Sequence, residues 1–114
     1  MEIKIIAEII SLGEVKKLAE DTFGDMVKAA VDVEKKIIAI GGELHADAEA
    51  ILIDNGSEQK NIWGINIYPD KPRNEWIEYI SLINIRPKQN NRSMKIEDTG
   101  LQKRINEIIN SAIQ

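Results

Sequence analysis

The sequence lacks cysteine altogether, which excludes a disulfide framework, thiolate metal ligands and thiol nucleophiles. It also lacks an apolar stretch of the roughly 18 residues that a membrane-spanning helix requires. The first ten residues carry charges within their apolar run, and no small-residue cleavage site follows them, so no secretory signal is indicated. These absences predict a soluble cytoplasmic protein with no membrane partner.

Strong catalytic motifs are missing as well. The chain has no phosphate-binding P-loop, no dinucleotide-binding glycine fingerprint, no paired-histidine zinc motif and no nucleophile elbow. The sequence therefore assigns no reaction by motif, and it leaves open whether the protein is an enzyme.

The composition is that of one globular domain covering residues 1–114. The 114 residues are 43% hydrophobic and 30% charged, which is unlike a disordered chain. The net charge of −4 is uneven. Residues 1–57 hold 6 Lys/Arg and 12 Asp/Glu, whereas residues 58–114 hold 9 and 7. The overall acidity disfavours broad nucleic-acid binding, which depends on neutralising phosphates.

The first half predicts a strand, a helix and a hairpin. Residues 2–7 alternate weakly, as in an edge strand, and Ser11 with Glu14 forms a capping box that starts a helix at 11–22. Residues 27–34 alternate with period two, and an apolar run at 37–40 follows a charged turn at 34–36, which favours a β-hairpin within 26–45; one amphipathic helix is the alternative reading. The pair Gly41-Gly42 indicates a bulge or a close backbone approach.

The second half predicts a helix, two strands and a final helix. The strand of the hairpin is expected to continue to about residue 45, and a helix to follow over 47–55. A strand at 62–68 and a turn with two prolines precede a long apolar segment, 76–86, expected to be a central strand. A second capping box starting at Thr99 opens the last helix, whose apolar stripe is Leu101, Ile105, Ile108, Ile109 and Ala112.

These elements predict an α+β fold with a small antiparallel sheet of four to five strands and three helices. Their order is β-α-ββ-α-ββ-α, in which the first strand is the least marked, and the helices are expected on one face. Small sheets of this kind often expose an edge or a face that a second copy covers, so a homodimer is a possible partner state.

One candidate site is the acidic stretch around the single histidine. On a strand, side chains two residues apart share a face, so one histidine and its neighbouring carboxylates would be able to hold Mg²⁺, Mn²⁺ or Zn²⁺. Asp32 and Glu34 would join them if the strand register allows. The alternative is an ordinary solvated acidic face. The candidate catalytic residues are Glu43, His45 and Asp47, and the candidate metal ligands are these three with Glu49.

A second candidate is the loop 86–95, which holds four positive charges and no acid. Guanidinium groups with amide and hydroxyl donors suit a phosphate or carboxylate, so the expected anion-binding residues are Arg86, Asn91, Arg92 and Ser93. The alternative is a surface loop whose arginines pair with the acidic half of the chain. The aromatic residues Trp63, Tyr68 and Trp76 would line a pocket or stack on bases, although core positions are commoner for such residues.

Three motifs resemble those of a family of small uncharacterised prokaryotic proteins. They lie at residues 31–34 (VDVE), 41–49 (GGELHADAE) and 83–94 (INIRPKQNNRSM), with Trp63-Gly64 between the last two. The resemblance covers roughly residues 20–110 and implies no activity and no site residues. It supports the hairpin, because similar members have a turn-type glycine near position 36, where this chain has lysine.

Two functions follow as hypotheses. The first is a small binding module for an anionic ligand or a protein partner, acting through the 86–95 loop. The second is a metal-dependent hydrolase of a phosphate ester or phosphodiester, with a divalent cation as cofactor and the arginines holding the anion. The hydrolase requires the acidic stretch and the cationic loop to face one cavity.

Overall fold

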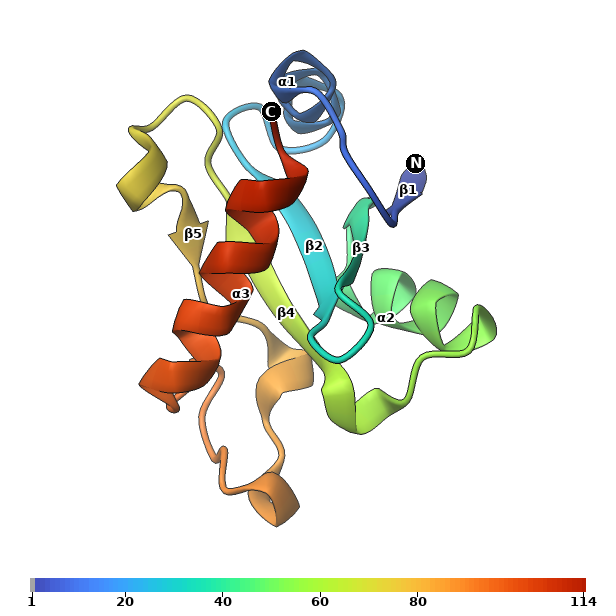
Figure 1. The fold of residues 1–114 in the computed structure, drawn as a ribbon, viewed down its shortest axis with the longest axis vertical. Helices are drawn as coiled ribbons and strands as arrows, with labels where there is room; N and C mark the ends of the chain where they lie inside the picture. The colour runs from blue at the N-terminus through green and yellow to red at the C-terminus, as the bar shows by residue number, and fades with distance from the viewer. Residues whose placement is uncertain (1) are drawn as a thin grey trace.

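Five antiparallel strands form one sheet in the order β1-β3-β2-β4-β5 (Figure 1). The computed structural model describes residues 2–114, and within them it has three α-helices, which confirms the predicted α+β class. The strands are β1 (Ile3–Ile6), β2 (Val27–Asp32), β3 (Ile37–Gly41), β4 (Ile62–Ile67) and β5 (Ile77–Glu78); the helices are α1 (Leu12–Asp21), α2 (His45–Asp54) and α3 (Thr99–Ala112).

The predicted hairpin is confirmed by the pairing of β2 with β3. Its turn is stabilised by Asp32, whose Oδ1 accepts hydrogen bonds from the backbone N–H groups of Glu34 (2.9 Å) and Lys35 (3.0 Å). Lys36 closes the turn with a φ of 58°, in the left-handed region that favours glycine. A lysine thus occupies a glycine-type position, as the resemblance implied.

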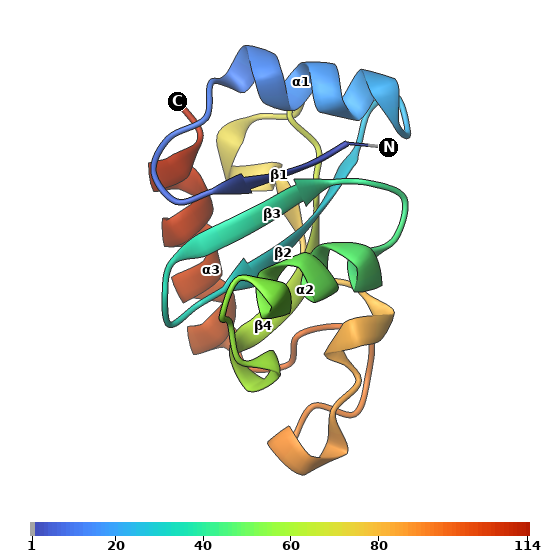
Figure 2. The same cartoon turned by 90° about the vertical axis from the view of Figure 1, so that its right-hand side faces the viewer.

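The two faces of the sheet are covered by different helices, so the expectation of helices on one face is wrong. Alternate residues of β2 explain this, because Val27, Ala29 and Val31 face one side of the sheet and Ala30 faces the other. Val27, Ala29 and Val31 pack with α1 and α3 in the larger core, and Ala30 packs with Ala48 and Leu52 of α2 in the smaller one. Figure 2 shows the sheet between α3 and α2.

The predicted close backbone approach occurs at Gly41 and Gly42. A Cβ on Gly41 would lie 2.3 Å from the backbone oxygen of Glu2, and one on Gly42 would lie 2.9 Å from the Ile3 side chain. Both glycines also have positive φ angles, 114° and 77°. The pair therefore turns the chain out of β3 while β1 packs directly against it.

The first and last helices begin with side-chain caps. Ser11 Oγ accepts from the Glu14 N–H at 3.1 Å, as predicted. The second cap is one residue earlier than expected, because Asp98 and not Thr99 accepts from the N–H groups of Gly100 (2.8 Å) and Leu101 (3.2 Å). The predicted apolar stripe of α3 is buried, apart from the half-buried Leu101. Among residues 2–114, no helix combines the length and apolarity needed to cross a bilayer.

The segment 76–86 is not a central strand. Only Ile77 and Glu78 pair with β4, as the edge strand β5, and the chain then forms two 3-10 turns, η3 (Leu82–Asn84) and η4 (Pro87–Gln89). The apolar residues of this segment are therefore only partly used in the core. Leu82 is 71% exposed and Ile85 is 43% exposed.

Candidate functional site

The acidic stretch around His45 does not form the predicted face. The strand ends at Gly41 and helix α2 begins at His45, so the expectation of a strand to about residue 45 is wrong. Glu43 lies before the helix, and in a helix side chains two residues apart point in different directions, which separates Asp47 from both His45 and Glu49. Within the described chain, no group of three or more His, Asp or Glu side chains is placed to hold a metal ion. Asp32 and Glu34 instead contribute to the hairpin turn and to a contact with Arg104.

His45 is a buried residue on the α2 side of the sheet, with 8% of its surface exposed. Its Nε2 lies 2.8 Å from the backbone oxygen of Ile65. A carbonyl oxygen only accepts hydrogen bonds, so Nε2 carries the proton in the neutral ring. Burial lowers the pKa of His45, while the Ile65 carbonyl and Asn66 oppose the change and the charge of Lys28 adds to it. The imidazole is consequently neutral at pH 7 in the folded protein.

We expect this burial to make stability depend on pH. The folded pKa of His45 is below the ordinary value of 6.5, so the unfolded chain binds the proton more readily. The stabilisation is present above pH 6.5 and is lost as the pH falls toward the folded pKa, by at most about 1.4 kcal/mol per pH unit. Urea unfolding of wild type and His45→Gln between pH 7.5 and 5.5 measures this loss of stability. The difference in unfolding free energy between them should shrink on acidification; a constant difference would contradict the prediction.

Arg86 of the cationic loop is committed to the protein itself. Its Nε donates to Ile83 O (3.0 Å), its Nη1 to Gln59 O (2.8 Å), and its Nη2 to Ile62 O and to Glu49 Oε2 (3.2 Å). The side chain is 10% exposed, that of Glu49 is 13% exposed, and the guanidinium lies over the Trp63 ring. The acidic stretch and the cationic loop thus do meet, but as a structural ion pair. Arg86 is not free to bind an anion.

Asn91 and Ser93 also hold the loop together. Asn91 is 3% exposed, and its amide donates to the backbone oxygens of Asn84, Ser93 and Lys95. The carboxylate of Glu97 accepts from the backbone N–H groups of Arg92 and Ser93 and from the Ser93 hydroxyl, and these bonds lower the pKa of Glu97. Of the four predicted anion-binding residues, only Arg92 has an exposed side chain that makes no hydrogen bond or ion pair within residues 2–114, although its charge helps to lower the pKa of Glu97.

Asn84 is a residue that sequence reasoning passed over. It is fully buried, and its side-chain amide accepts from Gly64 N–H (2.8 Å) and donates to Gly64 O (2.9 Å) and Met94 O (3.1 Å). The amide occupies the place of a neighbouring strand on β4. A Cβ on Gly64 would lie 2.6 Å from Ser81 Cβ, so only glycine admits this approach. The signal was present in the sequence, since Gly64 and Asn84 both belong to the quoted motifs.

The aromatic residues belong to the core and its rim. Trp63 is 5% exposed and Trp76 is 2% exposed, and the indole N–H of Trp76 donates to Lys71 O at 2.7 Å. The Tyr68 hydroxyl lies 3.4 Å from Glu78 Oε1. None of the three lines a described cavity.

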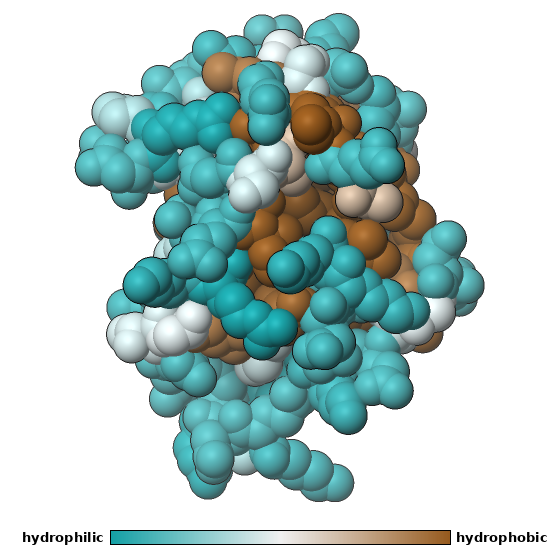
Figure 3. Space-filling model, viewed as in Figure 1, coloured by the Kyte–Doolittle hydropathy of each residue, from teal (hydrophilic) through white to brown (hydrophobic). Residues whose placement is uncertain are grey.

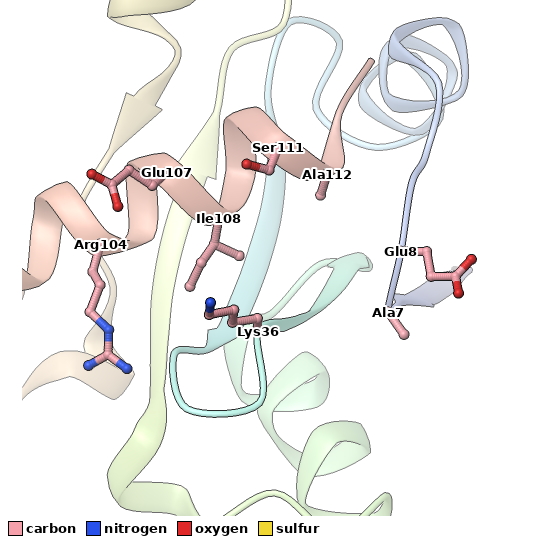
Figure 4. A pocket seen from close by; sticks show the side chains of 8 residues that line it. All are labelled: Ala7, Glu8, Lys36, Arg104, Glu107, Ile108, Ser111 and Ala112. Atoms are coloured by element: carbon pink, nitrogen blue, oxygen red, sulfur yellow. The ribbon is translucent and has the colours of Figure 1, made fainter.

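One cavity of about 540 Å³ lies beside α3, where Figure 3 shows an apolar hollow with a polar rim. Figure 4 shows Lys36 and Ile108 in its middle, with Glu8 directed away from it on the opposite wall. Its charged and hydroxyl side chains are all exposed, and they mix both signs of charge: Glu8, Lys36, Arg104, Glu107 and Ser111. No buried polar group is aimed at a ligand here, so the hollow offers little preorganisation.

Two further cavities lie side by side at the 82–95 segment, because Leu82 and Ile83 line both of them. The first, of about 570 Å³, includes Arg86 and Lys88; the second, of about 400 Å³, includes His45 and Asn66. Four exposed apolar side chains border them, and we call these the apolar ridge: Leu44 (56% exposed), Leu82 (71%), Ile85 (43%) and Met94 (41%). This face combines exposed apolar surface with recesses, as protein-binding surfaces do.

Leu82 is held rigidly although it is exposed. Ser81, which is 2% exposed, caps its 3-10 turn through a hydrogen bond from Ile83 N–H to Oγ at 3.2 Å. Asn84 fixes the other end of the turn to β4. The protein thus presents a large apolar side chain to solvent on a tethered turn.

Comparison with known proteins gives a family without an assigned activity. The family model described as "Protein of unknown function (DUF5674)" matches residues 4–112. No curated protein matches the chain. No solved structure matches it either. Because the family model spans nearly the whole chain, this protein belongs to the DUF5674 family.

Proposed function

We propose that the protein is an interaction module that binds an apolar, acidic segment of a partner protein across the apolar ridge. The observation that carries this proposal is Leu82, which is 71% exposed on a tethered turn and lines two cavities. A rigid exposed leucine between recesses contributes nothing to the core of the monomer. In a complex, burial of the Leu82 side chain would stabilise binding by about 25 cal/mol for each Å² of apolar surface removed from water.

The charge around the ridge supports an acidic partner. Lys28 lines one cavity and Lys88 the other, and Arg92 and Lys95 belong to the same loop as Met94. Within residues 2–114 none of these four cations forms an ion pair. Acidic side chains flanking the apolar contacts of a partner would complement them and increase its association rate.

The geometry gives less support to the hydrolase hypothesis. His45 is bonded to a backbone carbonyl, Arg86 is saturated by backbone carbonyls and Glu49, and the carboxylates of the acidic stretch diverge. A phosphate ester would meet neither a metal ligand set nor a free pair of arginines. The binding module is therefore the function that we propose.

Selection of random twelve-residue peptides displayed on phage tests the module. We expect enriched peptides to contain at least two apolar residues with acidic neighbours. Leu82→Asp should weaken their binding at least about 30-fold, the effect of a 2 kcal/mol hot spot. Ile9→Asp is the matched control, since Ile9 is 63% exposed and lines none of the cavities; it should change the affinity less than about twofold.

Three results would overturn the proposal. The first is a selection that enriches no common sequence, and the second is binding of the enriched peptides to Leu82→Asp as tight as to wild type. The third is a wild-type dimer in sedimentation equilibrium that Leu82→Asp dissociates, which would make a second copy of the chain the occupant of the ridge. A monomer with Leu82-dependent peptide binding is the expected outcome.

A further inference from the structure

The smaller cavity has an unusual polar floor beneath apolar walls. It measures about 400 Å³, within the range of small-ligand sites. Most of its lining is apolar: Leu44, Ala46, Ile80, Leu82, Ile83 and Met94. Its polar residues are Lys28, His45, Asn66 and Ser81, of which the last three are more than nine-tenths buried.

Asn66 brings an unsatisfied acceptor to this cavity. Its amide nitrogen donates to Glu78 Oε1 (2.7 Å) and lies 3.4 Å from Ile80 O, which fixes the orientation of the amide. Its Oδ1 is buried and, within residues 2–114, accepts no hydrogen bond while His45 is neutral. A buried acceptor left unpaired is destabilising, so a ligand that donates a hydrogen bond to it binds more tightly than one that cannot.

The neighbouring groups do not supply that donor. The proton of neutral His45 is on Nε2 and is directed to Ile65 O, which leaves Nδ1 without a hydrogen; the side-chain hydrogen bond to Asn66 that raises the pKa of His45 therefore favours the protonated ring. Ser81 Oγ accepts from Ile83 N–H, and its own hydrogen has no acceptor within residues 2–114. The cavity floor therefore offers an acceptor at Asn66 and a free hydroxyl donor at Ser81.

We propose that this cavity receives a tyrosine side chain of the partner segment, with its hydroxyl on Asn66. A phenol hydroxyl both donates and accepts, so it can donate to Asn66 Oδ1 and accept from Ser81. Its ring matches the apolar walls, and tyrosine is enriched among the residues that dominate binding at protein interfaces. Phenylalanine would fill the same walls and leave Asn66 unpaired. This inference rests on the proposed function, since it names the residue by which the partner is anchored.

The single histidine gives the experiment a direct signal. The imidazole resonances of His45 in the full chain are followed by NMR during titration with N-acetyltyrosinamide and with N-acetylphenylalaninamide, which lacks only the hydroxyl. We expect saturable shifts with the tyrosine compound and an affinity at least about tenfold above that of the phenylalanine compound, as for the loss of one buried hydrogen bond. Equal affinities, or no shift with either compound, would overturn the proposal.

Two variants identify the site. Asn66→Leu should remove the preference for the tyrosine compound. Asn66 also bonds Glu78, so if Asn66→Leu fails to fold, the second variant, Ala46→Trp, decides whether the compound binds in this cavity. Ala46→Trp changes an exposed position of α2 at the cavity wall and should abolish binding of both compounds, whereas Ile9→Asp should not. Retained binding in Ala46→Trp would place the ligand elsewhere and refute the proposal.

The NMR titration and the peptide selection can fail independently of each other. Enriched peptides that require Leu82 but lack tyrosine and leave the His45 resonances unchanged would refute the tyrosine and keep the interaction module. Binding of the tyrosine compound without any enriched peptide would refute the module and leave a phenol-binding cavity.

Discussion

Replacing Asn84 with alanine is expected to lower the free energy of unfolding by about 3–5 kcal/mol. The change removes the hydrogen bonds to Gly64 N–H, Gly64 O and Met94 O, all made by a side chain that is fully buried. The Gly64 groups would then be buried without partners, at about 1–3 kcal/mol each. Urea denaturation with the fluorescence of the two tryptophans measures the loss.

The control for Asn84 is Asn106→Ala on the exposed side of α3, which should change the unfolding free energy by less than about 0.5 kcal/mol. Gly64→Ala tests the same contact from the other side. Its new methyl group would meet Ser81, itself 2% exposed, so it should destabilise by a comparable amount. If Asn84→Ala were no more harmful than Asn106→Ala, the amide would not be holding the turn to β4.

Arg86→Ala should produce the second large effect, a loss of about 3–5 kcal/mol. It leaves Glu49 as a nearly buried carboxylate without its cation, and it deprives the oxygens of Gln59, Ile62 and Ile83 of a donor. Arg86→Lys should recover only part of the loss, because an ammonium keeps the charge but cannot reach several carbonyls as a planar fork does. Thermal unfolding of the three proteins gives the order wild type, Arg86→Lys, Arg86→Ala.

An exposed ion pair is the comparison for Arg86. Lys17 pairs with Asp21 at 2.6 Å, with side chains 68% and 54% exposed, and Lys17→Ala should lower the stability far less than Arg86→Ala does. Similar losses in Arg86→Ala and Lys17→Ala would mean that burial adds nothing to the Arg86 network. That result would also reopen Arg86 as a group available to an anion.

Local signals in the sequence predicted most elements of the fold. The Ser11 cap, the alternation of Val27 to Val33 and the stripe of α3 each depend on neighbours in the chain, and each is seen in the structure. The error at 76–86 has a different cause. An apolar segment looks like a central strand, and nothing local reveals that the Asn84 side chain replaces the backbone ladder on β4.

The site was predictable only in part, for the same reason. The 86–95 loop was singled out by its cations, and its contact with the acidic stretch was anticipated, but Arg86 and Asn91 proved to be structural. Leu82 and Ile85 were assigned to a strand because exposure is a property of the assembled fold and not of a residue type. His45 was noticed as a lone histidine, whereas its relation to Asn66 depends on β4 lying beneath α2.

The amide of Asn84 on β4 also bears on how copies of this chain behave at high concentration. Unpaired strand edges are templates on which further chains add and fibrils grow. On this edge of β4, only two residues pair with β5. The backbone N–H and C=O groups of Gly64 at the same edge are bonded to the Asn84 side chain, so an incoming strand would have to break these buried hydrogen bonds. At the opposite edge, β1 is only four residues long, and so short an edge strand is a poor template for a further strand. Crowded solutions of the protein should accordingly resist amyloid-like growth from the native state.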